Sequence, residues 1–345
     1  MFLHPLGTKD DKSTARKKHK KAHRFQESFK HQETIYGTAV PGKKGLTDKG
    51  SAAGPPRRDK TGCRCYSWGM ELTRTITLNN GVEMPTFGLG VFKAESGDET
   101  SNAVQWALDA GYTAVDTAAF YANEGSVGEG IRRSKTAREE VFVTTKVWNA
   151  DQGYENTLKA FEKSLKELKM DYVDLYLVHW PIKGKYKETW KALEELYRQK
   201  KVRAIGVSNF EPHHLDDLIK DAQVTPAVNQ VELHPYMQQR DVREACRRHN
   251  IAVTAWSPIA RGKVLTDKTI GAIAEDHGKT PVQVTLRWEL QHRIITIPKS
   301  VKKERIIENF NVFDFSLSDD EMARIDALDQ GNDGRIGPHP DTITV

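Results

Sequence analysis

The sequence predicts an α/β fold: a (β/α)8 TIM barrel that follows an N-terminal β-hairpin and a basic N-terminal extension. Eight short apolar segments alternate with amphipathic segments between residues 87 and 298, which is typical of parallel strands joined by helical crossovers. Nearly every apolar segment ends in a polar or ionisable residue, as expected where the C-terminal ends of barrel strands form a polar mouth. An open doubly wound sheet fits the alternation equally well, but the number of strands and their polar ends favour closure. No G-x-G-x-x-G sequence follows any of these segments, so a Rossmann dinucleotide site has no support.

The extension covers residues 1–70 and the barrel covers residues 71–345. Residues 1–70 hold 16 of the 52 Lys and Arg residues but 6 of the 47 Asp and Glu residues, so the positive net charge comes from this part. The segment has few large apolar side chains and cannot bury enough surface to offset its ordering entropy, so we expect it to be disordered. A nuclear-localisation or polyanion-binding role for its basic run, residues 17–21, stays open. The barrel itself is acidic, which predicts no nucleic-acid partner.

The compartment is indicated by what the sequence lacks. The N-terminal residues have no apolar core of a secretory signal peptide, and no window approaches the ~20 apolar residues of a membrane span. Cys63, Cys65 and Cys246 are too few for a disulfide framework. The Cys63-x-Cys65 spacing matches neither a zinc site nor a redox dithiol, so we expect no metal. These observations predict a cytoplasmic protein with no membrane partner.

The strands are expected in the following order. Residues 75–85 have the pattern of a β-hairpin, because Ile76 and Leu78 alternate with polar residues and Asn80-Gly81 favours a tight turn. The barrel strands are expected at residues 87–90, 113–116, 141–146, 173–179, 204–208, 227–232, 252–257 and 294–298.

Amphipathic segments predict the connecting helices. In residues 156–168 the apolar Leu158, Phe161 and Leu165 recur at helical spacing on one face. Other helices are expected between residues 121 and 141, at 101–110, 189–199, 212–222, 240–249, 269–277 and 281–291, and twice after the last strand.

Polar side chains gather at the C-terminal ends of the expected strands. In a barrel these ends meet at one mouth, where the following loops build the active site. Each residue alone is more typical of a helix cap or a buried hydrogen-bonded side chain, and only their joint occurrence indicates a site. The residues are Asp116, Lys146, His179, Ser208, Asn209, Gln230, Glu232, Ser257, Lys299 and Ser300.

Tyr121 is the candidate proton donor beside these residues. A phenol has an unperturbed pKa of about 10, and we expect an adjacent ammonium on Lys146 to lower that pKa if Asp116 keeps the lysine charged. Neutral His179 is suited to donate a hydrogen bond to the same substrate oxygen and so to orient it. The pattern contains no nucleophile and no metal-ligand set. Such a group protonates an oxygen, which suits carbonyl reduction if a hydride donor lies beside it.

Seven motifs carry a resemblance to a known family. In chain order they are VDTAAFYANEGSVGEGI, TTKVW, VDLYLVHWP, IGVSNF, VNQVELHP, AWSP and ITIPKSVKKERIIEN. Together they resemble the aldo-keto reductases. The likeness is greatest to the short-loop branch, which includes bacterial 2,5-diketogluconate and glyoxal reductases and protozoal prostaglandin F synthases. The resemblance implies NADPH-dependent reduction of aldehydes or ketones to alcohols, and we expect a monomer.

Position by position, the resemblance implies a role for each residue of the mouth. Tyr121 is the general acid, Lys146 and Asp116 tune it, and His179 orients the carbonyl group. Ser208, Asn209 and Gln230 bind the nicotinamide carboxamide, and Trp256 stacks on the nicotinamide ring in place of the family's tyrosine. Ser257 and Arg261 lie near the pyrophosphate. Lys299, Ser300 and Arg305 bind the 2′-phosphate, and Glu308 and Asn309 bind the adenine. Val91, Phe92, Trp148 and Trp180, with His179, line an apolar substrate pocket.

Two points stay open in the sequence. A barrel of this kind can also bind the cofactor and serve as a sensor or structural protein with little turnover, although the complete set of Asp116, Tyr121, Lys146 and His179 weighs against it. The short connection between residues 179 and 208 predicts an open pocket that tolerates varied carbonyl compounds, so the physiological substrate is not specified.

Overall fold

The structure, a computed structural model, describes residues 73–344. The extension predicted at residues 1–70 lies outside the described residues, as do Cys63 and Cys65.

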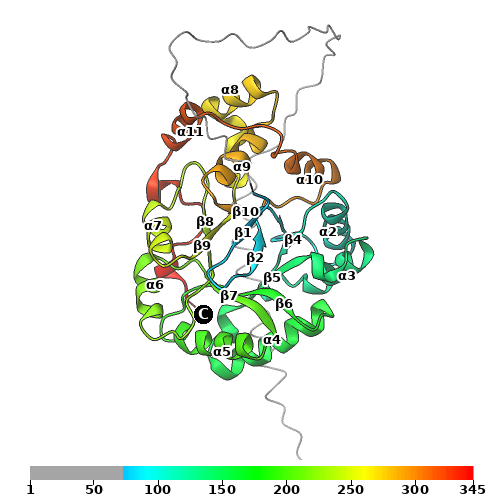
Figure 1. The fold of residues 1–345 in the computed structure, drawn as a ribbon, viewed down its shortest axis with the longest axis vertical. Helices are drawn as coiled ribbons and strands as arrows, with labels where there is room; N and C mark the ends of the chain where they lie inside the picture. Colours follow the sequence, from blue (N-terminus) through cyan, green and yellow to red (C-terminus); the bar gives the residue numbers. More distant parts are fainter. Residues whose placement is uncertain (1–72, 345) are drawn as a thin grey trace, which may run out of the picture. The chain divides into compact units, whose positions relative to one another are not determined.

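A β-hairpin precedes the barrel, as predicted. Strands β1 (Thr75–Thr77) and β2 (Glu83–Pro85) pair antiparallel. Gly81 has φ of 82° in the connecting turn, a conformation that glycine adopts without steric cost. Leu78 and Met84 are buried in one apolar cluster with Ala114 and Phe142, which begin two barrel strands. The hairpin therefore packs at the N-terminal end of the barrel, opposite to the expected mouth (Figure 1).

Eight parallel strands follow one another around the barrel in chain order, each paired with its neighbour in the sequence. They are β3 (Leu89–Gly90), β4 (Ala114–Asp116), β5 (Phe142–Val147), β6 (Val173–Val178), β7 (Val202–Ser208), β8 (Val228–Glu232), β9 (Ala252–Trp256) and β10 (Ile295–Thr296).

Bridges between the first and last strands close the barrel. Phe87 pairs with Thr296, and Gly90 pairs with Lys299, both in the parallel sense. A Cβ on residue 90 would lie 2.7 Å from the Ile297 carbonyl oxygen, so a glycine is needed for this close approach. The closed barrel confirms the predicted fold class and excludes the open doubly wound sheet.

Helices surround the strands (Figure 1). The helices are α2 (Asp98–Asp109), α3 (Glu124–Arg133), α4 (Tyr154–Leu168), α5 (Tyr186–Arg198), α6 (Pro212–Ile219), α7 (Arg240–Arg248), α8 (Lys268–His277), α9 (Pro281–Gln291), α10 (Lys303–Phe310) and α11 (Asp319–Asp326). Short 3-10 turns include η1 (Ala119–Tyr121), η3 (Asn149–Asp151) and η4 (Ala260–Thr266). Their order agrees with the predicted alternation, and α2 and α5 begin three residues earlier than expected. Within residues 73–344, no helix combines the length and the apolar character that a membrane crossing requires.

Candidate active site

A buried ion pair lies at the C-terminal ends of β4 and β5. Lys146 Nζ lies 2.5 Å from Asp116 Oδ1, and the two side chains are 0% and 6% exposed. The ammonium also donates to the Thr117 carbonyl oxygen at 2.9 Å and to the Tyr121 hydroxyl at 3.4 Å. The structure thus brings together the acid, the lysine and the tyrosine that the sequence analysis grouped.

The loop that carries Tyr121 is held by a residue that the sequence analysis missed. Asn123 is fully buried, and its side chain accepts from Thr117 Oγ1 at 2.9 Å and donates to the Val91 carbonyl oxygen at 2.9 Å. These bonds tie the turn η1 to the loops after β3 and β4. A small polar residue directly before a helix was the signal available in the sequence, but it is equally typical of an ordinary helix cap.

Tyr121 remains a neutral phenol in this environment. Burial raises its pKa above the ordinary value near 10, and Lys146 offsets only part of that rise while Asp116 adds to it. Lys146 lowers the phenol pKa, as the sequence analysis expected, but the cost of burying a phenolate is larger and keeps the pKa above its usual value. The protonated form is the one that a proton donor requires.

His179 follows β6 and faces the same group. Its ring centroid lies 5.8 Å from that of Tyr121 and 5.3 Å from that of Trp148, edge-on in both cases. Burial and the charge of Lys146 hold its pKa well below 6.5, so the imidazole is neutral at physiological pH. Its Nδ1 is buried and has no hydrogen-bond partner among the described residues. A neutral imidazole carries one N–H that can donate to a substrate oxygen and so orient it.

Amide and hydroxyl groups line the ends of β7 and β8. Ser208 Oγ donates to the Gln230 carbonyl oxygen at 2.8 Å, and Gln230 Nε2 donates to Asp116 Oδ2 at 2.7 Å. Gln230 therefore contacts the same carboxylate that holds Lys146, which links the predicted nicotinamide-binding residues to the ion pair.

Asn209 continues this arrangement toward β9. Its backbone has φ of 64°, a left-handed conformation that asparagine tolerates. Its side chain donates to the His179 carbonyl oxygen at 3.0 Å and accepts from Trp256 Nε1 at 2.7 Å. The indole of Trp256 is thus fixed beside the amides. Ser257, which follows it, also has positive φ, at 54°.

The residues predicted to bind a phosphate and an adenine lie between β10 and α10. The Lys302 N–H donates to Ser300 Oγ at 3.2 Å in the turn before the helix. Arg305 and Glu308 are exposed on α10, whereas Asn309 is buried. Lys299 is exposed and joins the barrel through its bridge to Gly90. Arg261 is exposed in η4, where its φ of 53° and the 93° of Gly262 produce a sharp turn.

Aromatic rings flank Tyr121 and His179. The Phe92 ring lies 4.9 Å from the Tyr121 ring, and Trp148 stacks on Phe120 at 3.8 Å. Phe120 was missed in the sequence, where its position next to Tyr121 in the AFY turn was the available signal. Of the other expected pocket residues, Val91 and Trp180 are buried.

The C-terminal segment packs against this part of the mouth. The buried Glu232, at the end of β8, accepts the backbone N–H groups of Ile336 and Gly337 at 2.5 and 2.8 Å. A Cβ on residue 337 would lie 2.5 Å from Trp256 Cη2, so glycine lets the backbone approach the indole. Glu232 thereby holds the segment beside Trp256.

Comparisons with known proteins agree with the fold and the site. Residues 86–330 match the model of the Aldo/keto reductase family. The chain is 59% identical over 271 residues to the 9,11-endoperoxide prostaglandin H2 reductase of Trypanosoma cruzi, which covers 78% of this chain and 95% of that protein. It is 56% identical over 272 residues to the glyoxal reductase of Bacillus subtilis, covering 79% and 98%. A mutant of Gox0644 solved in complex with NADPH matches with a TM-score of 0.75 and 46% identity over 79% of this chain and 98% of that one.

These matches extend over most of the barrel and over nearly the whole length of each relative. The chain therefore belongs to the aldo/keto reductase family, and it is an oxidoreductase.

Proposed function

We propose that this enzyme reduces the carbonyl group of small aldehydes and ketones to an alcohol, with Tyr121 as the proton donor. Membership of the aldo/keto reductase family supports carbonyl reduction. The observation that supports the role of Tyr121 is the 3.4 Å contact of its hydroxyl with the fully buried ammonium of Lys146.

The cofactor is NADPH or NADP+. A related structure holds NADPH, and the groups at the mouth fit this molecule chemically. Lys299 and Arg305, with the Ser300 hydroxyl, offer the two cationic groups and one hydrogen-bond donor that suit a phosphate. The indole of Trp256, bonded to the Asn209 amide, offers a flat face beside hydrogen-bonding groups. When bound, NADPH supplies the hydride that the carbonyl carbon receives.

The residues of the chain orient the substrate and move the proton. Neutral His179 donates a ring N–H to the carbonyl oxygen and holds it beside Tyr121. Tyr121, which burial keeps protonated, gives its phenol proton to that oxygen as negative charge develops there. The ammonium of Lys146 stabilises the phenolate that remains, and Asp116 keeps the ammonium charged and in place.

We propose a substrate pocket that is apolar and not highly selective. Phe92, Phe120 and Trp148 surround the reacting group with aromatic surface, which suits small or aromatic carbonyl compounds. Two relatives of similar identity are named for glyoxal and for a prostaglandin endoperoxide, which are very different substrates. That difference supports a pocket whose walls constrain the substrate weakly.

A substrate panel tests the reaction class. NADPH oxidation is measured with glyoxal, an aliphatic aldehyde and 4-nitrobenzaldehyde, and the same panel is repeated with NADH. We expect turnover with at least one compound and a higher kcat/KM with NADPH. Quenching of tryptophan fluorescence by NADPH with no turnover of any carbonyl compound would instead support the sensor or structural alternative.

We also propose that the protein is a monomer in the cytoplasm. Within residues 73–344 the exposed large apolar side chains are Leu265 and Ile307, so the described surface has no extended apolar patch for a second subunit. Cys246 is a free, buried thiol, which is compatible with a reducing compartment. Light scattering after size-exclusion chromatography should give the mass of one chain, and the mass of two chains would contradict the proposal.

Residues 1–70 are proposed to be an extension that takes no part in the chemistry. Every residue placed above in the candidate site lies after residue 90. Deletion of residues 1–69 should leave kcat and KM unchanged, and a large loss of activity would contradict this proposal.

A further inference from the structure

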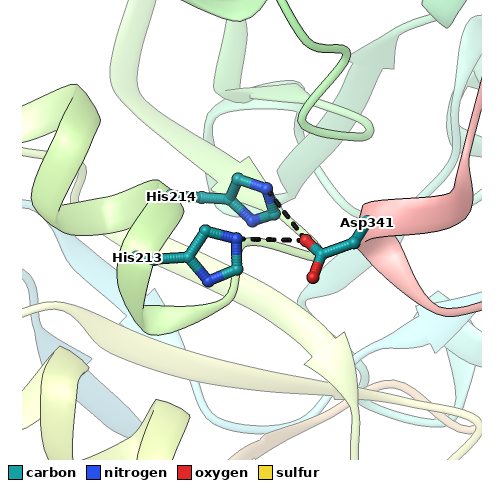
Figure 2. Close-up of side chains that lie close together, drawn as sticks. All are labelled: His213, His214 and Asp341. Carbon is teal, nitrogen blue, oxygen red and sulfur yellow. Dashed lines mark hydrogen bonds and ion pairs between the residues drawn. The ribbon is translucent and has the colours of Figure 1, made fainter.

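A cluster of metal-ligating side chains lies where the C-terminal segment meets helix α6, apart from the proposed catalytic group. Figure 2 shows His213 and His214, in the first turn of α6, pointing toward the carboxylate of Asp341. His213 Nε2 lies 3.0 Å and His214 Nε2 lies 3.2 Å from the same oxygen, Asp341 Oδ1. One ligating atom from each residue lies within 4.8 Å of the other two, and no other such group of three occurs in the part of the chain that the structure describes.

These separations resemble the edges of a metal coordination polyhedron. A tetrahedral zinc ion with bonds of about 2.0–2.1 Å to nitrogen and oxygen has edges of about 3.3 Å between its ligand atoms. The observed nitrogen–oxygen separations of 3.0 and 3.2 Å are close to that value. His213 and Asp341 are 128 positions apart in the sequence, so the fold, and not local chain geometry, brings them together.

We propose that His213, His214 and Asp341 bind a divalent transition-metal ion such as Zn²⁺, with water completing its coordination. Two imidazoles and one carboxylate are the ligand set that Zn²⁺, Co²⁺ and Ni²⁺ accept, whereas Mg²⁺ and Ca²⁺ require mainly oxygen ligands. A ligating imidazole must be neutral.

Metal binding requires one rearrangement at His214. Its Nδ1 accepts the backbone N–H of Glu211 at 3.2 Å, so Nε2 carries the ring proton and lies 3.2 Å from Asp341 Oδ1. Ligation through Nε2 shifts the proton to Nδ1 and gives up the bond from Glu211, which is a single neutral hydrogen bond. His213 has a side chain that is 61% exposed and can adjust freely. The site is therefore expected to bind with moderate affinity.

The ion would attach the C-terminal segment to α6 in addition to two contacts that already hold this segment against the barrel. Arg335 of this segment pairs with Glu211 at 3.2 Å, and Glu232 holds the backbone at Gly337, which lies against Trp256. The metal site is thus part of the same contact that places the segment beside the mouth. It does not depend on the proposed reaction.

Zinc binding to the full chain tests the proposal. Wild type, His213→Gln, Asp341→Asn and His277→Gln are dialysed against the same free Zn²⁺ concentration and analysed for metal. His277→Gln is the matched control, because His277 pairs with a single carboxylate, that of Glu321, at 2.8 Å. We expect wild type and the control to hold one more zinc ion per chain than the other two variants. Zinc, but not Mg²⁺, should raise the Tm of wild type and the control alone.

Comparison between variants is essential, because residues 1–70 contain further histidines and two cysteines that can bind zinc in all four proteins. Melting without zinc verifies that the exposed His213→Gln substitution leaves the fold intact. Co²⁺ gives a second readout, since tetrahedral coordination produces visible absorption bands that His213→Gln and Asp341→Asn should lose. Equal zinc content in the four proteins, or equal zinc-dependent rises in Tm, overturns the proposal.

Discussion

Lys146 and Asp116 form a buried ion pair across the ends of two neighbouring strands, with 2.5 Å between Nζ and Oδ1. Burial alone would lower the pKa of Lys146, but the charge of Asp116 and the hydrogen bonds of the ammonium to Asp116 and Tyr121 outweigh burial and raise that pKa above its ordinary value. The lysine is therefore positively charged at the point where a phenolate forms when Tyr121 gives up its proton. This fixed charge is the electrostatic basis of the proposed mechanism.

Asp116→Asn should damage both activity and stability. The substitution leaves the ammonium of Lys146 buried without a counter-charge, and the loss of one partner of a buried pair costs about 3–5 kcal/mol. We expect the free energy of unfolding, from urea denaturation, to fall by that amount and kcat to fall about 100-fold. Glu188→Gln is the matched control, because its pair with Lys191 is more than half exposed. A neutral effect of Asp116→Asn on both quantities would show that the pair is not essential.

His179 makes the protein less stable in acid. Its folded pKa lies well below 6.5, so the unfolded chain binds one more proton than the folded protein between that pKa and about 6.5. The contribution of neutral His179 to the free energy of unfolding is therefore present in full above about pH 6.5 and is lost as the pH falls through this window. His179→Gln removes the titrating group, so the folded and unfolded proteins no longer differ by this proton. The difference in unfolding free energy between pH 7.5 and pH 5.5 should be smaller in the variant than in wild type, and an unchanged difference would contradict the low pKa.

Arg305→Ala should weaken NADPH more than NADH. If the guanidinium contacts the 2′-phosphate, its removal costs a charge-assisted hydrogen bond of about 1.5–3 kcal/mol, or about 10- to 150-fold in Kd. NADH lacks this phosphate and should bind equally well to both proteins. Fluorescence quenching measures both affinities. Lys303→Ala, an exposed cation on the same helix, is the control. Equal losses of affinity for the two cofactors, or equal losses in the two variants, would show that Arg305 does not bind the 2′-phosphate.

Glu289→Met should stabilise the barrel. Glu289 is fully buried on α9, and neither carboxyl oxygen makes a hydrogen bond of normal geometry among the described residues, although the Thr296 hydroxyl lies near enough to offset part of the cost of burial. Burial raises its pKa well above 4.5, so the unfolded chain releases a proton that the folded protein retains, and stability falls as the pH rises above about 4.5.

The gain from Glu289→Met should be about 1–3 kcal/mol, the usual cost of an unsatisfied buried polar group, and larger at pH 8 than at pH 5. Glu275→Met, at an exposed position of α8, should change stability by less than about 0.5 kcal/mol. Destabilisation by Glu289→Met would mean that the carboxyl group has a partner after all.

The sequence predicted the barrel because each strand is a short apolar run with a polar end. That pattern is local, so it can be recognised without knowing which residues are in contact in the folded protein. It predicted the grouping of Asp116, Lys146 and His179 for the same reason, since strand ends must meet in a closed barrel. The closure itself depends on the approach of Gly90 to Ile297, which only the structure reveals.

Features that depend on long-range packing were not predictable. The pKa of Tyr121 is governed by burial, and a sequence shows its charged neighbours but not how far water is excluded. The contact of His213 and His214 with Asp341 requires the C-terminal segment to return to α6. Asn123 could not be distinguished from an ordinary helix cap until its bonds to Thr117 and Val91 were seen.

Tyr121→Phe tests the proposed mechanism most directly. The substitution removes the phenol proton and little else, so NADPH affinity, measured by fluorescence quenching, should be unchanged. We expect kcat for 4-nitrobenzaldehyde to fall by about 100-fold or more, in line with the loss of a general acid. Wild-type kcat in a Tyr121→Phe protein that binds NADPH normally would show that another group delivers the proton.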